Sequence, residues 1–307
     1  MASIEKGAPE LALDKPMKPG NVRLRSPANG KDGRTRFRAK KSLGQHFLVE
    51  TKIIHKMIAC AGFNVSDRVL EIGPGQGALT IPLARSVEHV IAVEKDTHLL
   101  LSLQKRLNRA GISNVTLINH DILKWDFQEI KGLSSKRIPV IGNLPYNISS
   151  PVLEKLVKNR DLISRSVLMF QLEVAKRLTA SPGSKAYGAL TLLVRYYAQP
   201  RPLLEVSKDA FNPKPNVDSM VLELDFEKPY PGGTFSEDTF KKIVKDAFAH
   251  RRKTMVNSLR DVSPSWDREA LLDAMKRCGI DPKKRAETLD MGAFLCLTDA
   301  LSNTDCR

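Results

Sequence analysis

Five short runs of apolar residues, separated by segments of helical length, constrain the fold of this chain more than any other feature. These runs are RVLEIG (68–73), HVIAVE (89–94), VTLINH (115–120), IPVIGN (138–143) and SVLMFQ (166–171). Strands that are apolar along their whole length are buried on both faces, as happens where parallel strands alternate with helices. The sequence therefore predicts an α/β fold with a doubly wound parallel sheet.

Two later runs and a change of composition predict the remaining architecture. LTLLVRYY (190–197) and SMVLELDF (219–226) lie close together, so we expect antiparallel strands added at a sheet edge. After EKPYPGG (227–233), amphipathic stretches such as 240–259 and 268–279 predict helices, the second one closed by a glycine. We expect three parts, namely a flexible basic arm over 1–37, a catalytic domain over 38–230 and a smaller all-helical domain over 231–307.

Basic residues outnumber acidic ones, most strongly near the N-terminus. Lys and Arg total 49 against 34 Asp and Glu, which gives a formal charge of +15. Residues 1–41 hold 11 basic and 4 acidic residues, a net charge of +7, without apolar periodicity. This balance fits a polyanionic partner, with nucleic acid as the leading candidate. The arm itself fits either a solvated tail or an RNA-binding segment.

Cysteine spacing and hydropathy bear on the compartment. Cys60, Cys278, Cys296 and Cys306 lie far apart and outside any CxxC or Cys/His spacing. We therefore expect neither a zinc site nor a disulfide framework. This cysteine usage fits a protein of a reducing compartment. No run of 18 apolar residues occurs, and the first 16 residues contain acids and lack an apolar core. We expect a cytoplasmic protein without a membrane span.

The segment VLEIGPGQGALT (69–80) reads as a strand, a glycine loop and a helix. Gly73, Gly75 and Ala78 have the spacing of a dinucleotide-binding loop. Glu94 ends the next strand about 20 residues later, where its carboxylate could accept two ribose hydroxyls. These features alone suit NAD as well as S-adenosylmethionine, so an NAD-linked oxidoreductase is a competing hypothesis.

Two further acids favour the methyl donor. Glu71 precedes the glycines inside the strand, as an acid does in S-adenosylmethionine sites. Asp121 follows the third strand, where it could bind an adenine amine. An aspartate at a strand end is more often a turn or cap residue, so Asp121 alone decides little.

The tetrapeptide NLPY (143–146) follows the fourth strand, beside the expected donor. An exocyclic adenine amine is a poor nucleophile because its lone pair is delocalised into the ring. The Asn143 side-chain oxygen and the Leu144 carbonyl could accept its two hydrogens, so that the lone pair faces the donor. Pro145 would hold the turn and Tyr146 would stack on the base, a contact of about 1 to 3 kcal/mol. For the tetrapeptide alone, an ordinary proline turn with a core tyrosine is the alternative.

Five motifs in a fixed order resemble one family. They are KKSLGQHFL (40–48), LEIGPGQGALT (70–80), VEKD (93–96), NLPYNISSP (143–151) and AFNPKPNVDSMV (210–221). Over about residues 38–295 the chain resembles the ribosomal RNA adenine dimethyltransferases, which implies a Rossmann-like domain that uses S-adenosylmethionine. PKPNVDS and GNLPYNIS look most like the small-subunit enzymes, rather than the macrolide-resistance or mitochondrial branches. Those enzymes dimethylate two adjacent adenosines in the 3′-terminal hairpin loop of 16S-type rRNA and serve small-subunit ribosome biogenesis.

The resemblance implies roles for single residues. For the donor these are a lid over the methionine end from Gln45, His46 and Leu48, backbone contacts from Gly73 and Gly75, the ribose contact from Glu94 and the adenine contact from Asp121. Asn143 would bind both donor and target, and Phe211 would close the face of the flipped base opposite Tyr146. His46 departs from the family pattern, which often has asparagine there.

The resemblance also implies partners, namely small-subunit rRNA and the immature small ribosomal subunit, and we expect a monomer. The segment AHRRKTMVNSLR (249–260) would place Arg251, Arg252, Lys253 and Arg260 on a helix of the second domain. They could line a track for RNA phosphates, and a solvated helix face is the alternative. A ribosome-assembly factor, for which methylation is incidental, is a competing function of a different class.

Overall fold

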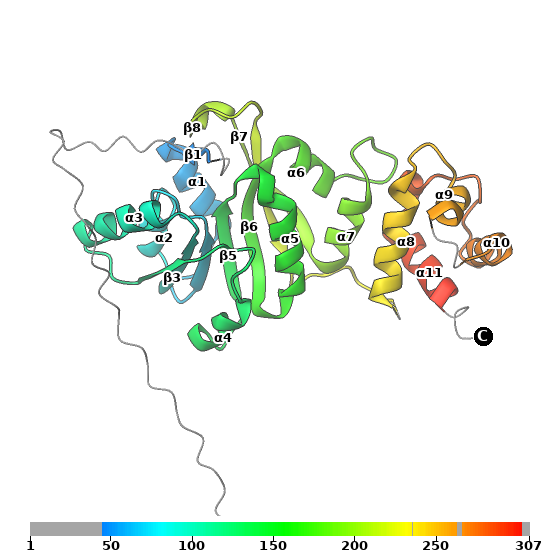
Figure 1. The fold of residues 1–307 in the computed structure, drawn as a ribbon, viewed down its shortest axis with the longest axis horizontal. Coiled ribbons are helices and arrows are strands. Elements are labelled where there is room, and N and C mark those ends of the chain that lie inside the picture. The colour runs from blue at the N-terminus through cyan, green and yellow to red at the C-terminus, as the bar shows by residue number, and fades with distance from the viewer. Residues whose placement is uncertain (1–44, 235, 263–265, 303–307) are drawn as a thin grey trace, which may run out of the picture. The chain divides into compact units, whose positions relative to one another are not determined.

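The computed structural model describes residues 45–234, 236–262 and 266–302, so the expected basic arm lies outside the described residues. Within these ranges, a seven-stranded sheet has the order β4-β3-β2-β5-β6-β9-β7, of which β3, β5, β6 and β7 are labelled in Figure 1. Its strands are β2 (Arg68–Ile72), β3 (His89–Glu94), β4 (Val115–Asn119), β5 (Ile138–Asn143), β6 (Ile163–Gln171), β7 (Gln199–Val206) and β9 (Ser219–Asp225). The order confirms the predicted doubly wound α/β fold.

The register of the sheet brings the motif residues to one edge. Strands β4, β3, β2, β5 and β6 run parallel, while β9 is antiparallel to both β6 and β7. Glu71 pairs with Ala92 on one side and Ile141 on the other. The strand order reverses at β2, and ligands bind at such a switch point, outside the carboxyl ends of the strands.

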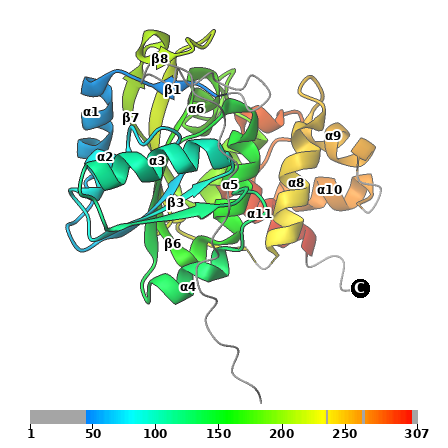
Figure 2. The same cartoon turned by 60° about the vertical axis from the view of Figure 1, so that its left-hand side comes forward.

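Helices cover both faces of the sheet (Figure 2). They are α1 (Thr51–Ala61), α2 (Thr80–Ala84), α3 (Thr97–Arg109), α4 (Ile130–Leu133), α5 (Ser149–Lys158), α6 (Leu172–Leu178) and α7 (Ala189–Tyr197). Side chains alternate between the two faces along a strand. Accordingly, Val90 of β3 packs in a core with Met57 of α1, whereas its neighbour Ile91 packs in another core with Leu156 of α5.

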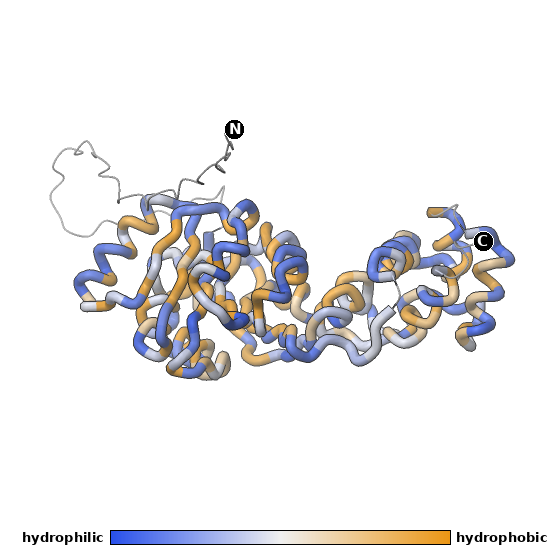
Figure 3. Tube along the Cα trace, turned by 90° about the horizontal axis from the view of Figure 1, so that it is seen from below, coloured by the Kyte–Doolittle hydropathy of each residue, from blue (hydrophilic) through white to orange (hydrophobic). Residues whose placement is uncertain are grey.

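The C-terminal part is helical. It consists of α8 (Glu237–Ala249), α9 (Met255–Val262), α10 (Arg268–Arg277) and α11 (Met291–Ser302), along which hydrophilic and hydrophobic stretches alternate (Figure 3). Side chains cap two of these helices: Ser236 accepts from Thr239 N at 3.2 Å and Asp267 from Ala270 N at 2.7 Å. The buried core of these helices also contains residues before the expected boundary, including Tyr187 and Leu192. The division at residue 230 stays a prediction.

The prediction of a strand at 190–197 is wrong. This segment is α7, and its apolar character has another cause. Val194 packs in the core of the sheet, whereas Leu192 and Tyr196 pack in the core of the C-terminal helices. A helix buried from two sides reads as a continuous apolar run, which periodicity cannot distinguish from a buried strand.

The sheet edge also differs from the expectation. The run 219–226 is a strand, β9, as predicted, but it lies inside the sheet between β6 and β7. The edge strand is β7, which contains Pro200 and Pro202. An edge tolerates proline because the missing N–H removes no hydrogen bond to a neighbouring strand.

The expected single helix over 240–259 is also wrong, since α8 ends at Ala249 and α9 begins at Met255. The intervening turn is tied to a later loop, because Met255 N donates to Lys284 O at 2.9 Å. Arg251, Arg252 and Lys253 therefore lie in a turn rather than on a helix, and Arg260 lies on α9. The helix predicted over 268–279 is confirmed as α10, followed by Gly279 with φ of 65°.

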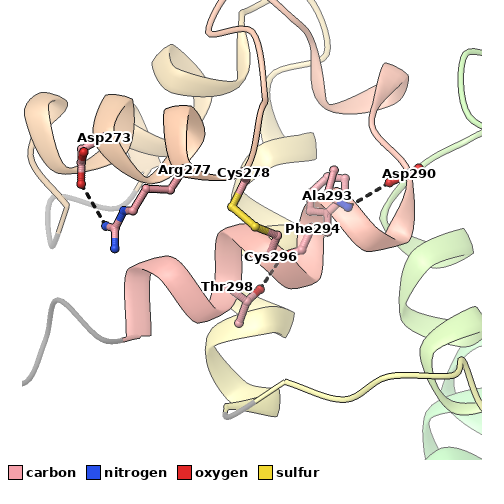
Figure 4. The surroundings of a disulfide bond; sticks show 8 residues. All are labelled: Asp273, Arg277, Cys278, Asp290, Ala293, Phe294, Cys296 and Thr298. Carbon is pink, nitrogen blue, oxygen red and sulfur yellow. Dashed lines mark hydrogen bonds and ion pairs between the residues drawn. A yellow bond between two sulfur atoms is a disulfide. The ribbon is translucent and has the colours of Figure 1, made fainter.

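The expectation that no disulfide forms is wrong as well. Cys278 at the end of α10 and Cys296 on α11 form a disulfide with a Cα–Cα distance of 5.8 Å (Figure 4). They are 18 residues apart, and the packing of α10 against α11 brings them together. Among the described residues, Cys60 is a free and exposed cysteine. In the same ranges, no helix is long and apolar enough to cross a membrane.

Candidate active site

The carboxyl ends of the central strands open into a pocket of about 990 Å³. Most of the predicted site residues line it: Gln45, His46, Leu48, Glu71, Gly73, Gly75, Glu94, Asp121, Asn143, Leu144 and Tyr146. They come from segments as far apart as the strand before α1 and the loop after β5. The parallel sheet brings them together because all these strands end at the same edge.

The glycine loop is fixed to Glu94 at the end of β3. Gly75 N donates to Glu94 Oε2 at 3.1 Å, and Asp96 N donates to Glu94 Oε1 at 2.8 Å. Burial raises the pKa of Glu94, and these two hydrogen bonds oppose the rise. Gly75 has φ of 56°, a left-handed conformation that favours glycine, and a Cβ there would crowd the Phe47 ring at 3.2 Å. Each Glu94 oxygen keeps a lone pair for a ligand hydroxyl.

Glu71 is a fully buried carboxyl group in the wall of the pocket. Burial raises its pKa to about 8, the Thr80 hydroxyl lowers it, and the neighbouring Glu94 adds to the rise. Within the described part of the chain, Glu71 Oε2 has no hydrogen-bond partner. A buried carboxyl oxygen without a partner is costly, and a cationic ligand beside it would remove that cost.

Asp121 lies in the turn after β4. Its Oδ1 accepts from Leu123 N at 3.0 Å, and its Oδ2 forms an ion pair with Lys95 at 2.9 Å. Burial raises the pKa of Asp121, but the hydrogen bonds from Lys95 and Leu123 outweigh it and hold the pKa below its usual value. The side chain is therefore an oriented carboxylate at the pocket rim.

Lys155 of α5 braces this turn, and sequence reasoning missed it. Its ammonium donates to Leu123 O at 2.9 Å and to Trp125 O at 2.5 Å, and it lies 5.3 Å from the centre of the Phe127 ring. Burial lowers the pKa of Lys155. The only signal for it in the sequence was a lysine on the helix that follows NLPY. Lys155 thus links the α5 segment to the turn that carries Asp121.

The orientation of the Asn143 amide follows from one contact. Asn143 Nδ2 donates to the backbone carbonyl of His46 at 3.0 Å. A carbonyl only accepts, so the amide nitrogen must face His46, and the other end, Oδ1, is left as an acceptor. The Leu144 carbonyl is a second acceptor, because it forms no backbone hydrogen bond among the described residues. Two acceptor oxygens thus occur in successive residues at the end of β5.

Tyr146 lies in a short 3₁₀ helix, η3 (Tyr146–Ile148), and its hydroxyl is fixed by Ser219 at 2.7 Å. Burial raises the pKa of Tyr146, so the phenol is neutral at physiological pH. Ser219 begins β9 and was missed because it reads as part of an apolar run.

Strand β1 (Phe47–Leu48) lines the pocket and pairs antiparallel with the short strand β8 (Phe211–Asn212). Phe211 pairs with Leu48 in this ladder. Its side chain is only 4% exposed and belongs to a hydrophobic core, and it is not among the residues that line the pocket. Its role as a stacking partner of the target base stays a prediction.

The predicted RNA-binding residues lie apart from the pocket, where three loops meet. Arg251 donates to Lys185 O at 2.8 Å and pairs with Glu287 at 3.3 Å. Lys253 and Arg260 share Asp261. The exposed basic residues of these three loops are Lys185, Arg251, Arg252, Lys253, Lys283, Lys284 and Arg285. Sequence reasoning missed the loop over 283–285, although the run KKR was a usable signal.

Comparison with known proteins agrees with this geometry. A family model described as "Ribosomal RNA adenine dimethylase" matches residues 36–303. The chain belongs to this family. It is 44% identical over 263 residues to the ribosomal RNA small subunit methyltransferase A of Desulforapulum autotrophicum. The aligned part covers 86% of this chain and 92% of the relative. For the protein of the same name from Pelotomaculum thermopropionicum, the identity is 43%, with 85% and 90% covered.

A solved structure supports the same assignment. The dimethyladenosine transferase from Plasmodium falciparum superposes with a TM-score of 0.70 at 28% identity and covers 82% of this chain and 96% of its own. As a member of the rRNA adenine dimethylase family, the protein is an enzyme that transfers methyl groups from S-adenosylmethionine to adenine in ribosomal RNA. The predicted family, enzyme class and cofactor are confirmed.

The residues of the pocket fit this cofactor. S-adenosylmethionine carries a ribose with two hydroxyls and two positively charged groups, a sulfonium and an amine. The spare lone pairs of Glu94 suit the hydroxyls, and the partnerless carboxyl oxygen of Glu71 suits a positive charge. Within the described ranges, no cluster of three or more His, Cys, Asp or Glu could hold a metal ion.

Proposed function

We propose that this rRNA adenine dimethylase modifies the exocyclic amines of two adjacent adenosines in the 3′-terminal hairpin loop of small-subunit rRNA. The small-subunit assignment is supported by the names of the relatives that are 44% and 43% identical. The loop assignment follows the resemblance of the GNLPYNIS and PKPNVDS motifs to that branch. Bases in a hairpin loop are unstacked and can enter a pocket singly.

The fixed orientation of the Asn143 amide carries the mechanism. With Nδ2 held by His46 O, the Oδ1 atom can accept one N–H of the adenine amine, and the Leu144 carbonyl can accept the other. Both bonds move electron density toward the amine nitrogen and favour a tetrahedral nitrogen, whose lone pair is no longer delocalised into the ring. S-adenosylmethionine supplies an electrophilic methyl group. After transfer the amine becomes strongly acidic and can lose its proton to water, so no general base is required.

The other predicted residues have supporting roles in this proposal. Tyr146 would stack on the base, Glu94 would bind the ribose of the donor, and Asp121 would bind its adenine. Gln45, His46 and Leu48 would cover the methionine end, and the loop at Gly73 and Gly75 would contact the donor backbone.

We further propose that the enzyme acts in the cytoplasm, as a monomer, on the immature small subunit. The seven exposed basic residues at the junction of three loops support contact with RNA phosphates. The monomeric state is supported by the exposed apolar side chains. Within the described ranges, the large exposed apolar residues are isolated from one another along the chain: Val49, Val65, Leu101, Val217 and Val262. The rRNA substrate supports the cytoplasmic location.

Replacement of Asn143 by alanine tests the mechanism. We expect kcat to fall by about 100-fold or more, the usual effect of removing one preorganised hydrogen-bonding group. RNA affinity should stay near that of the wild type, because the amide polarises the amine rather than docks phosphates. The matched control is Asn108→Ala, which removes an exposed amide on α3. Methylated adenines would be mapped by mass spectrometry, and N143A turnover within a few-fold of the wild type would refute the mechanism.

A further inference from the structure

The turn that begins at Asp121 is closed by its own hydrogen bonds and by Lys155 from another segment. Asp121 O accepts from Lys124 N and Trp125 N, both at 2.8 Å. Asp121 Oδ1 accepts from Leu123 N at 3.0 Å. These bonds use N–H groups of the turn, so the carbonyls of Leu123 and Trp125 need donors from elsewhere. The Lys155 ammonium donates to both, at 2.9 and 2.5 Å.

A lysine suits this place because an ammonium has three donors and both carbonyls only accept. Beneath the turn, Trp125 and Phe127 are each 1% exposed, and the Phe127 ring centre lies 5.3 Å from the Lys155 ammonium. The two hydrogen bonds of Lys155 are themselves partly buried. A side chain without donors would leave two carbonyls unpaired in this setting, and the turn would shift to expose them to water.

The other lysine at this turn, Lys95, contacts the carboxylate instead of the backbone. Its Nζ lies 2.9 Å from Asp121 Oδ2, but its side chain is 59% exposed. An exposed ion pair contributes little, because water screens it and a long side chain has to be ordered. Lys155 is half-buried and binds main-chain carbonyls. Lys155 therefore determines where the turn lies, whereas Lys95 neutralises its carboxylate.

Lys155 acts from outside the pocket. Asp121 and Leu123 line the pocket, and Lys155 is not among the described residues that do so. Its helix, α5, begins at Ser149, directly after the short helix η3 that carries Tyr146. One helix of ten residues thus connects the NLPY turn with the turn of Asp121. Any effect of Lys155 on a ligand must pass through the turn that it holds.

We propose that Lys155 is a positioning residue that fixes the Asp121 carboxylate against the adenine of the donor and thereby sets the preference for an adenine-containing donor. This inference rests on the proposed contact of Asp121 with that adenine. A fixed carboxylate accepts an N–H of the adenine amine and repels the oxygen that hypoxanthine has at the same position. A carboxylate on a displaced turn meets both bases through water, so the preference falls when Lys155 is lost.

The test compares S-adenosylhomocysteine with S-inosylhomocysteine by calorimetry, because these two ligands differ at that amine. We expect the wild type to bind the adenine compound about 10- to 150-fold more tightly, the range for a hydrogen bond to a charged group. Lys155→Met should lower this ratio by about 5-fold or more, the equivalent of one ordinary hydrogen bond. Lys155→Arg, which has donors for both carbonyls, should keep most of the ratio. The matched control is Lys158→Met, which removes an exposed lysine of the same helix.

Asp121→Ala separates this inference from the proposal on which it rests. D121A should lose the preference, and adding K155M to D121A should lower it no further. If D121A keeps the wild-type ratio, the adenine contact of Asp121 is wrong and the role of Lys155 falls with it. If D121A loses the ratio while K155M keeps it, Lys155 only stabilises the fold and the positioning role is overturned. Should thermal unfolding show that K155M does not fold, Lys155→Gln, with donors for one carbonyl, takes its place and is read in the same way.

Discussion

Replacing Glu71 with glutamine should make the protein without its donor more stable at neutral pH. Unfolded Glu71 releases its proton near its ordinary pKa of 4.5, whereas burial holds the proton in the folded state up to about pH 8. Between these pH values the folded state binds more protons than the unfolded state. The free energy of unfolding therefore falls as pH rises through this window.

The size of the effect follows from the two pKa values. Integrating the proton uptake gives a loss of roughly 1 kcal/mol at pH 5 and roughly 3 kcal/mol at pH 7. Glutamine has nearly the same shape and does not titrate, so E71Q escapes this loss. The difference in stability between E71Q and the wild type should grow by about 2 to 3 kcal/mol from pH 5 to pH 7.

Urea unfolding at pH 5, 6 and 7 measures this difference, and Glu154→Gln, an exposed carboxyl on α5, is the matched control. E154Q should follow the wild type at each pH. Calorimetry should also show that E71Q binds S-adenosylmethionine more weakly, because the positive charges of the donor favour an ionised Glu71. Unfolding free energies of E71Q and the wild type that stay parallel across this range would refute the reasoning.

Three further predictions concern the ribose contact, the basic loops and the disulfide. Glu94→Ala should weaken S-adenosylmethionine binding by about 1.5 to 3 kcal/mol, as for a hydrogen bond to a charged group, and calorimetry showing unchanged affinity would place the ribose elsewhere. Replacing Arg251, Arg252 and Lys253 with glutamine should flatten the dependence of log RNA affinity on log salt by about 0.7 to 0.9 per lost phosphate contact, and an identical slope would mean a solvated surface. Cys278→Ser should lower the free energy of unfolding by about 3 kcal/mol, the value for a closed loop of this length, but only without reductant. Equal stability of wild type and variant under oxidising conditions would contradict the disulfide.

The sequence by itself determined the sheet and most of the pocket. Five strands were predicted at their observed positions because a strand buried on both faces needs an unbroken apolar run, and segments that contain helices separate these runs. The glycine loop and Glu94 could be predicted from their spacing along the chain. The glycines are a local signal because a backbone with positive φ favours glycine whatever the rest of the fold. Once the strands are parallel, residues at their carboxyl ends must meet, so Glu71, Asp121 and Asn143 could be placed together without coordinates.

Tertiary packing decided the features that depend on a partner distant in sequence. An apolar run became α7 because two cores bury it, and the stretch over 240–259 broke into two helices because Met255 N bonds to a loop 29 residues away. Two cysteines without a motif became a disulfide because α10 and α11 pack side by side. The direction of the Asn143 amide and the contact of His46 with Tyr146 depend on segments about 100 residues apart. Such contacts leave no periodic or local signal, because they arise from the fold rather than from the spacing of residues along the chain.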